Sequence, residues 1–214
     1  MKRREILAGT AGIAAFSLAG CLGIVGLDEH EATPAGVESA VREETGYEQT
    51  NVDEMVIERT VDVAGVSQDI RVTNYLTEHQ KSIDLGPLGS VKAASFVVLT
   101  SPQISIVGQD FNPIADMAAE ELIDLIEADF DAINNAEHVS CETVSLLGQE
   151  TTESLFEAEA TFDGVTIDVN IHITESVDTA NDHLVTIGVY PKQMESVEAD
   201  NIAQLQSGIV ESIE

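Results

Sequence analysis

The segment FEAEATFDGVTIDVNIHI, residues 156–173, indicates the fold more clearly than any other part of the chain. Apolar residues occupy every second position in 156–162 and again in 165–173. This is the pattern of half-buried strands, because successive side chains of a strand point to opposite faces. Asp163-Gly164, between the two runs, is typical of a type I′ hairpin turn. We therefore predict an antiparallel hairpin with one buried face and one face in water.

Other apolar and β-branched runs predict further strands around this hairpin. The segment Phe96-Val97-Val98-Leu99 is apolar throughout, which favours a strand at the centre of the sheet. Ala64-Gly65 separates two runs that we expect to pair antiparallel. The predicted strands span residues 55–63, 70–79, 91–99, 104–107 and 183–189.

Three stretches have the pattern of amphipathic helices. The longest, residues 115–133, has one apolar stripe and carries Asp and Glu on its other side. A shorter helix is predicted over residues 34–45, with Pro34 at its first position and Gly46 at its end. A third begins near Ser196 and continues toward the C-terminus.

Runs of strands with segregated helices favour an α+β fold. We expect an antiparallel meander with one long central helix and a C-terminal helix packed on it. The 181 residues from Pro34 to Glu214 are enough for one domain and few for two. The prediction is therefore a single domain, residues 34–214, with an N-terminal helix.

The start of the chain has the parts of an export signal. Arg3-Arg4 precedes a mildly apolar run and fits the twin-arginine route, and Leu18-Ala19-Gly20-Cys21 has the form of a lipobox. We expect residues 1–20 to be a signal peptide and Cys21 to take a lipid. Residues 21–33 would then tether the domain to the outer face of the cell membrane.

An uncleaved signal anchor is the alternative interpretation of this segment. No charged residue occurs in residues 6–27, a run of 22 that is long enough to span a bilayer. Five glycines in this run weaken it as a helix. Both interpretations hold the rest of the chain outside the cell, attached to the membrane.

The chain is strongly acidic, with 9 Lys and Arg against 39 Asp and Glu and a net charge of −30. Such a surface cannot neutralise phosphates, so nucleic acid is excluded as a partner. Self-repulsion of this size destabilises a compact state in dilute salt, whereas concentrated salt screens it. The composition therefore predicts a salt-adapted protein of a halophile.

The two cysteines leave no intramolecular disulfide. If Cys21 carries lipid, Cys141 has no partner in the chain. Cys141 lies in a segment with His138 and Glu142, which together supply a thiol, an imidazole and a carboxylate for nucleophilic chemistry. In an extended strand His138 and Cys141 point to opposite faces, so a structural strand cysteine is the simpler interpretation.

Two further groups of residues are candidates for ligand recognition. Asp168, Asn170 and His172 share one strand face at a spacing of two, which indicates either a polar or weak metal site or the solvated face of a half-buried sheet. Phe111 and Asn112 belong either to a recognition loop or to a turn that leads into the long helix.

The familiar motifs of enzymes and metalloproteins are absent. The sequence contains no HExxH, CxxC, EF-hand loop, nucleophile elbow, phosphate loop or dinucleotide-binding fingerprint. We therefore expect no dedicated metal site, no cofactor and no assigned catalytic residue.

Short motifs along the chain resemble a family of uncharacterised haloarchaeal exported lipoproteins. They are the two N-terminal motifs, Thr45-Gly46-Tyr47, Val72-Thr73-Asn74-Tyr75, Leu85-Gly86-Pro87-Leu88-Gly89, Gly108-Gln109-Asp110-Phe111-Asn112-Pro113 and Leu147-Gly148-Gln149-Glu150-Thr151. The resemblance implies location and salt habit only. The order of elements from about residue 96 to 213 is similar to the PsbP-like α+β fold, whose members are mostly accessory or binding proteins.

The functional expectation is a lipid-anchored, non-catalytic module on the outer cell surface, binding an envelope protein or a small ligand. The alternatives are a hydrolase-like enzyme, using His172 with Asp168 or His138 with Cys141, and a structural envelope protein.

Overall fold

The computed structural model describes residues 28–63, 66–84, 90–106, 109–111, 114, 117, 122–123, 132–162 and 165–213. Its strands are β1 (Asp28–Glu31), β2 (Gly36–Val37), β3 (Glu48–Val63), β4 (Val66–Asp84), β5 (Ser90–Pro102), β6 (Ile104–Ile106), β7 (Gln109–Phe111), β8 (Ala132–Leu146), β9 (Gln149–Phe162), β10 (Val165–Thr174), β11 (Val177–Asp178), β12 (Asp182–Pro191) and β13 (Ile209–Val210). Its helices are α1 (Ser39–Thr45), the 3-10 turn η3 (Lys192–Met194) and α3 (Glu195–Ser207).

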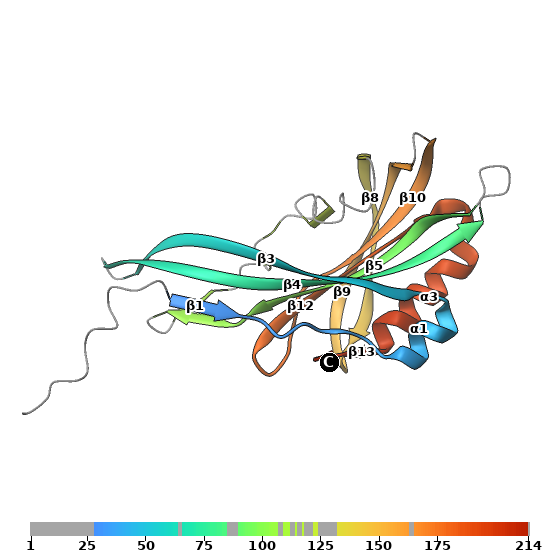
Figure 1. The fold of residues 1–214 in the computed structure, drawn as a ribbon. Coiled ribbons are helices and arrows are strands. Elements are labelled where there is room, and N and C mark those ends of the chain that lie inside the picture. Colours follow the sequence, from blue (N-terminus) through green and yellow to red (C-terminus); the bar gives the residue numbers. More distant parts are fainter. Residues whose placement is uncertain are drawn as a thin grey trace, which may run out of the picture.

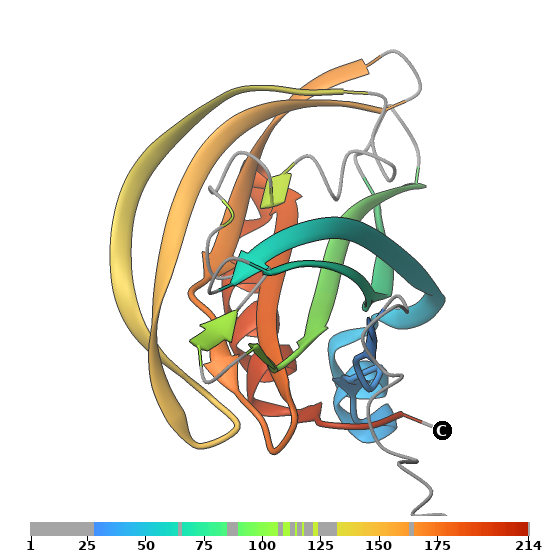
Figure 2. The same cartoon turned by 90° about the vertical axis from the view of Figure 1, so that its left-hand side faces the viewer.

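The described strands form one large sheet and two small ones. The large sheet has nine strands in the order β1-β4-β5-β12-β10-β9-β8, with β3 also paired to β4 and β11 to β12. β1 runs parallel to β4, and the other pairings in this sheet are antiparallel. Figure 2 shows that the sheet is strongly curved, with β8 and β9 forming an arc at one side.

The hairpin on which the sequence prediction rests is confirmed. β9 pairs antiparallel with β10 from Val165–Phe162 at the turn end to Thr174–Glu153 at the far end. The predicted turn at Asp163-Gly164 lies outside the described residues. β5 lies between β4 and β12, which confirms the central position predicted from its apolar run.

Side chains from the two faces of the sheet form two separate cores. Val97 and Leu99 of β5 face one core, which also contains Ile114, Leu122 and Ile123. Phe96 and Val98 face the other, which contains Ile202 and Leu205 of α3. β5 is therefore buried on both faces, and Figure 1 shows α1 and α3 side by side near one end of the sheet.

The predicted α+β architecture with a long central helix is wrong. Strands account for most of the described chain, and the sheet is mixed rather than a short meander. Most of the predicted helix, residues 115–133, lies outside the described residues. Leu122 and Ile123 within it are helical, as predicted, but its last two residues already belong to β8. The apolar spacing of this segment matched a helical period, yet Ile133 is buried in the sheet core as a strand residue.

The two other predicted helices are present with changed limits. α1 begins at Ser39 instead of Pro34, because Gly36 and Val37 pair with β13 as a short strand. Gly46 ends α1 in the left-handed conformation, with φ of 77°, as its position predicted. α3 begins at Glu195 and ends at Ser207, after which the chain forms β13.

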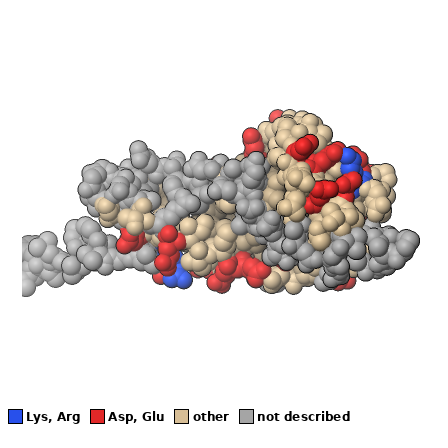
Figure 3. Space-filling model, turned by 90° about the horizontal axis from the view of Figure 1, so that it is seen from above, with Lys and Arg blue, Asp and Glu red and all other residues tan. Residues whose placement is uncertain are grey.

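The acidic composition is visible on the surface. Figure 3 shows several groups of Asp and Glu with few Lys or Arg near them. Residues 1–27, including Arg3, Arg4 and Cys21, lie outside the described residues, so the export and lipid predictions stay predictions. No helix in the described part of the chain is long and apolar enough to cross a bilayer.

Candidate functional site: a pocket on the curved sheet

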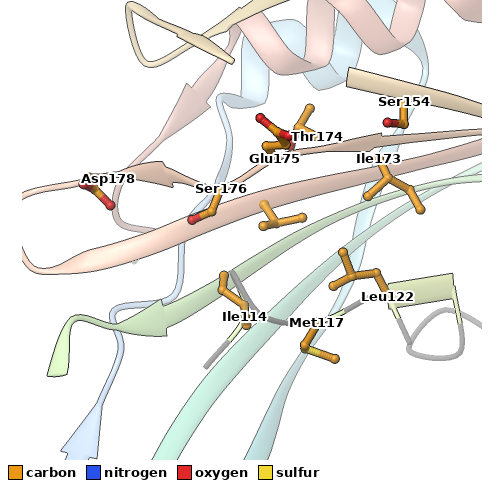
Figure 4. A pocket seen from close by; sticks show the side chains of 10 residues that line it. Ile114, Met117, Leu122, Ser154, Ile173, Thr174, Glu175, Ser176 and Asp178 are labelled. Carbon is orange, nitrogen blue, oxygen red and sulfur yellow. The ribbon is translucent and has the colours of Figure 1, made fainter. Parts of the chain in front are cut away.

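A pocket of about 450 Å³ lies on one face of the large sheet. We call it the sheet pocket, and it is lined by Ile114, Met117, Leu122, Ser154, Ile173, Thr174, Glu175, Ser176, Asp178 and Val185. Figure 4 shows Ile114, Met117 and Leu122 on one side of it and the residues of β9 and β10 on the other. Its volume lies in the range of small-molecule sites.

The apolar wall of the sheet pocket is formed by side chains that point to the same face of neighbouring strands. Ile173 of β10 and Val185 of β12 belong to the core that also contains Leu122. Ser154 of β9 is the direct partner of Ile173 in the sheet, so its hydroxyl adds a polar group to the same face. The result is an apolar surface with a small number of polar groups.

The polar rim of the sheet pocket comes from the end of β10 and the connection to β11. The Glu175 N–H donates to the Thr152 carbonyl oxygen at 2.7 Å, which fixes this connection to β9. Asp178 lies 2.7 Å from Nδ1 of His183, so its carboxylate accepts from the protonated nitrogen. The Ser176 hydroxyl oxygen is buried and has no hydrogen-bond partner within the described chain.

A thiol and an imidazole meet beside the sheet pocket, contrary to the sequence argument. The ring nitrogen Nε2 of His138 lies 3.1 Å from Sγ of Cys141. The register of β8 against β9 shifts between His138 and Ser140, so the strand carries an extra residue there. This bulge turns His138 and Cys141 to the same side, whereas a regular strand would separate them.

Ser154 connects this pair to the sheet pocket. Its Oγ lies 3.5 Å from Sγ of Cys141, and the same residue lines the sheet pocket. His138 also packs edge-on against Phe156, with ring centroids 5.3 Å apart. Cys141 and His138 are both exposed, so the thiol is open to reagents from solvent.

A buried polar network lies on the opposite face of the sheet, beneath α3. His172 of β10 has Nδ1 2.7 Å from Oε1 of Glu153 and Nε2 2.9 Å from the Tyr190 hydroxyl. Gln206 of α3 donates from Nε2 to the other oxygen of Glu153. Glu153, His172, Tyr190 and Gln206 are all buried, with exposed fractions of 8% or less. Burial raises the pKa of the Tyr190 hydroxyl, which keeps it protonated as a donor.

A second buried group holds the other part of α3. Glu198 accepts from the Tyr47 hydroxyl at 3.0 Å and from Nζ of Lys81 at 2.7 Å. Nζ of Lys81 also lies 5.5 Å from the centroid of the Tyr47 ring. Burial and the neighbouring Glu198 carboxylate raise the pKa of Tyr47 far above its ordinary value.

The structure separates the three strand residues predicted as a polar site. Asp168 is exposed, whereas Asn170 and His172 are buried, so the expected solvated face is wrong for this part of β10. His172 belongs to a buried network on this face, to which α3 contributes Gln206 through its hydrogen bonds with Glu153 and Thr186. Asn170 donates to the Tyr190 hydroxyl at 3.5 Å, and its Oδ1 has no partner in the described part of the chain.

Asp168 lines a separate surface hollow of about 470 Å³ with Lys192 and Glu195. Lys192 pairs with Glu157 at 2.6 Å, and this hydrogen bond raises the pKa of Lys192. No cluster of three or more His, Cys, Asp or Glu within the described residues is placed to hold a metal ion.

Phe111 and Asn112 are the other predicted recognition residues, and Phe111 belongs to none of the sites formed by the described residues. Phe111 ends β7 and pairs with Ile104 of β6, while Asn112 lies outside the described residues. Sequence reasoning missed Glu153, Tyr190 and Gln206. In β9 the alternation of side chains, followed from Phe156 toward the start of the strand, places Glu153 on the same face of the sheet as His172. The sequence therefore contained a signal for Glu153. Gln206 had no comparable signal because it comes from a helix distant in sequence.

The chain belongs to the family described as a domain of unknown function (DUF6517), whose model matches residues 34–210. Among solved structures it is similar to cyanobacterial PsbP (CyanoP) from Synechocystis sp. PCC 6803. That similarity covers 90% of this chain and 98% of the other at 14% sequence identity, with a TM-score of 0.32, and it supports no further conclusion. The comparison with curated proteins gave no match.

Proposed function

We propose that this protein is a lipid-anchored module on the outer face of the cell membrane that binds a small ligand in the sheet pocket. The observation that carries the binding role is the sheet pocket itself. It combines an apolar wall from Ile114, Met117, Leu122, Ile173 and Val185 with a few polar groups at its rim. This is the usual composition of a small-molecule site, where apolar burial supplies affinity and polar groups orient the ligand.

The charge and the N-terminal motif support the cellular setting of this proposal. A net charge of −30 is incompatible with a nucleic-acid partner and fits a protein that is exposed to concentrated salt outside the cell. The lipobox ending at Cys21 supplies the anchor. A protein held at the membrane surface can deliver a captured ligand to a membrane partner.

A neutral environment-sensitive dye, Nile red, tests the binding role in concentrated KCl. We expect its fluorescence to rise on addition of the domain and to saturate at one dye per chain. Replacing Ser154 by Phe places a ring at the pocket wall and should abolish this signal. Replacing Ser145, an exposed residue of β8 outside the sheet pocket, by Phe adds the same ring as a control and should leave it unchanged. Equal binding by the wild type and the Ser154→Phe variant would contradict the proposal.

Mass spectrometry of the membrane-extracted protein tests the anchor. We expect a mature chain that begins at Cys21 and carries a diacylglyceryl mass, and a Cys21→Ser variant that loses this mass. A full-length chain that still contains residues 1–20 would favour the signal anchor instead.

A second candidate function, thiol-based hydrolysis, is favoured by the 3.1 Å contact between His138 and Cys141. An imidazole at this distance can take the thiol proton and so generate the nucleophile. The test is the rate of alkylation of Cys141 by iodoacetamide across pH, compared with a His138→Gln variant. A rate at neutral pH that drops at least tenfold in the variant would support an activated thiol, and equal rates would contradict it.

A further inference from the structure

We propose that the ligand of the sheet pocket is an apolar molecule that carries a cationic head with N–H donors, such as a protonated amine. This inference rests on the binding function proposed above and names the class of ligand. It is carried by the positions of Ser176 and Asp178 at one end of the sheet pocket and of Leu122 and Ile173 at the other.

One end of the sheet pocket suits an apolar body. Leu122 and Ile173 are buried core residues, with exposed fractions of 6% and 4%, and their side chains line the pocket together with Met117. Figure 4 shows Leu122 and Ile173 at the same end, opposite each other across the pocket. A hydrocarbon chain placed there removes apolar surface from water, and this stabilises the complex in proportion to the apolar area that is buried.

The other end suits a positive charge. Figure 4 shows Ser176 and Asp178 displaced toward this end, away from Leu122. Asp178 adds a carboxylate at this end, and Glu175, which Figure 4 shows beside Thr174, adds a second one between the two ends. None of the lining residues that the structure describes is Lys or Arg. An anionic head would meet like charges here, whereas an ammonium group would meet acceptors.

Ser176 supplies an independent sign that this end receives a hydrogen-bond donor. Its Oγ is buried and has no partner within the described chain, although buried hydroxyl groups are normally hydrogen-bonded. A protonated amine has three N–H donors, enough to reach a hydroxyl and a carboxylate together. Asp178 accepts from His183 through Oδ1, so its second oxygen and the Glu175 carboxylate are both acceptors for the ligand.

The acidic surface of the whole molecule attracts any cation, so the inference needs a test that separates local from diffuse attraction. Concentrated salt makes this separation, because at about 1 M the Debye length is only about 3 Å. Diffuse attraction then disappears, while a hydrogen-bonded ion pair in a pocket remains.

The experiment is displacement of Nile red from the intact domain in concentrated KCl by three molecules of equal chain length. Hexylammonium, hexanol and hexanoate share an apolar body and differ in the charge of the head. We expect hexylammonium to displace the dye at a concentration at least fivefold lower than hexanol, and hexanoate to be the weakest. The Glu175→Gln variant should reduce the advantage of hexylammonium, because one of the two carboxylates is lost, and should leave hexanol unchanged.

Glu44→Gln is the matched control, because Glu44 is an exposed carboxylate on α1, outside the sheet pocket. An equal loss in Glu44→Gln and Glu175→Gln would overturn the inference in favour of diffuse charge. Equal displacement by all three molecules would also overturn it, while binding in the sheet pocket would stand. Nile red that does not bind, or that binds the Ser154→Phe variant normally, would instead overturn the proposed function.

Discussion

The hydroxyl of Tyr190 lies 2.9 Å from Nε2 of His172, in the interior between the sheet and α3. The other ring nitrogen of His172 faces the Glu153 carboxylate at 2.7 Å. A carboxylate only accepts, so Nδ1 carries the proton and Nε2 accepts from the tyrosine hydroxyl. The order of carboxylate, imidazole and hydroxyl therefore joins β9, β10 and β12 by side-chain bonds.

Removing one member of this network should be costly. A His172→Leu variant leaves Glu153 buried without its main partner, and we expect the free energy of unfolding to fall by about 3 kcal/mol. Urea denaturation in concentrated KCl measures this loss, with Thr166→Ala as an exposed control on the same strand. The double variant Glu153→Leu, His172→Leu should recover part of the loss, because no buried carboxylate is then left without a partner. A double variant less stable than the single one would contradict this account.

Acid should destabilise the protein through His79. This residue is fully buried in the sheet, with Nδ1 3.0 Å from the Phe96 carbonyl oxygen, and burial lowers its pKa from 6.5 to about 4. The unfolded chain therefore takes up a proton at higher pH than the folded chain. Neutral His79 makes its full contribution to the free energy of unfolding above pH 6.5. This contribution is lost progressively as the pH falls from 6.5 to about 4, and the total loss is about 3 kcal/mol.

The difference between wild type and a His79→Leu variant isolates this contribution from the titration of the many carboxylates. We expect the stability of the variant to change less with pH between 7 and 4 than that of the wild type. Identical pH profiles of the two proteins would show that His79 is not the responsible group.

Close packing between β12 and α3 predicts that Gly188 cannot be enlarged. A Cβ at this position would lie 2.8 Å from Cδ1 of Ile202, which is buried in the same core. We expect Gly188→Ala to lower the midpoint of thermal unfolding, at a cost of roughly 1–3 kcal/mol. Adding Ile202→Val removes the Cδ1 methyl and should restore part of the stability. If the second substitution only adds to the loss, the clash is not the cause.

Removal of salt should unfold the domain. The structure describes few basic partners for the acidic surface, so most of the net charge of −30 is not paired locally. Dialysis into dilute buffer lengthens the range of repulsion from about 3 Å at 1 M salt to about 30 Å at 0.01 M. We expect the strand signal in circular dichroism to decrease and to return when KCl is restored. A spectrum unchanged in dilute buffer would contradict the prediction.

The strands of the hairpin could be predicted because alternation is a local property of the chain. A side chain on β10 points to one face or the other according to its position alone, so Val169, Ile171 and Ile173 were assigned correctly to a buried face. The same reasoning could not tell that the opposite face is also buried. Asn170 and His172 look like solvent-facing residues in sequence, but both are buried, and Gln206 of α3 joins the network around His172 through Glu153.

The helix prediction for residues 115–133 shows the limit of periodicity. The spacing of three and four residues agrees with Leu122 and Ile123, which are helical, but Ala132 and Ile133 are strand residues that pair with β9. Pairing with a neighbouring strand is a long-range interaction, and local spacing contains no information about it.

The sequence by itself determined the local properties: the register of β9 and β10, the central place of β5, the end of α1 at Gly46 and the acidic charge. Tertiary structure alone decided which residues meet across the fold. The bulge in β8 brings His138 to Cys141, α3 brings Gln206 to Glu153, and the curved sheet places Ser154 and Leu122 around one pocket. The physical reason is that side-chain direction and charge depend on neighbours in the chain. The His138–Cys141 and Gln206–Glu153 contacts and the shared pocket of Ser154 and Leu122 depend instead on how separate segments of the chain pack against one another.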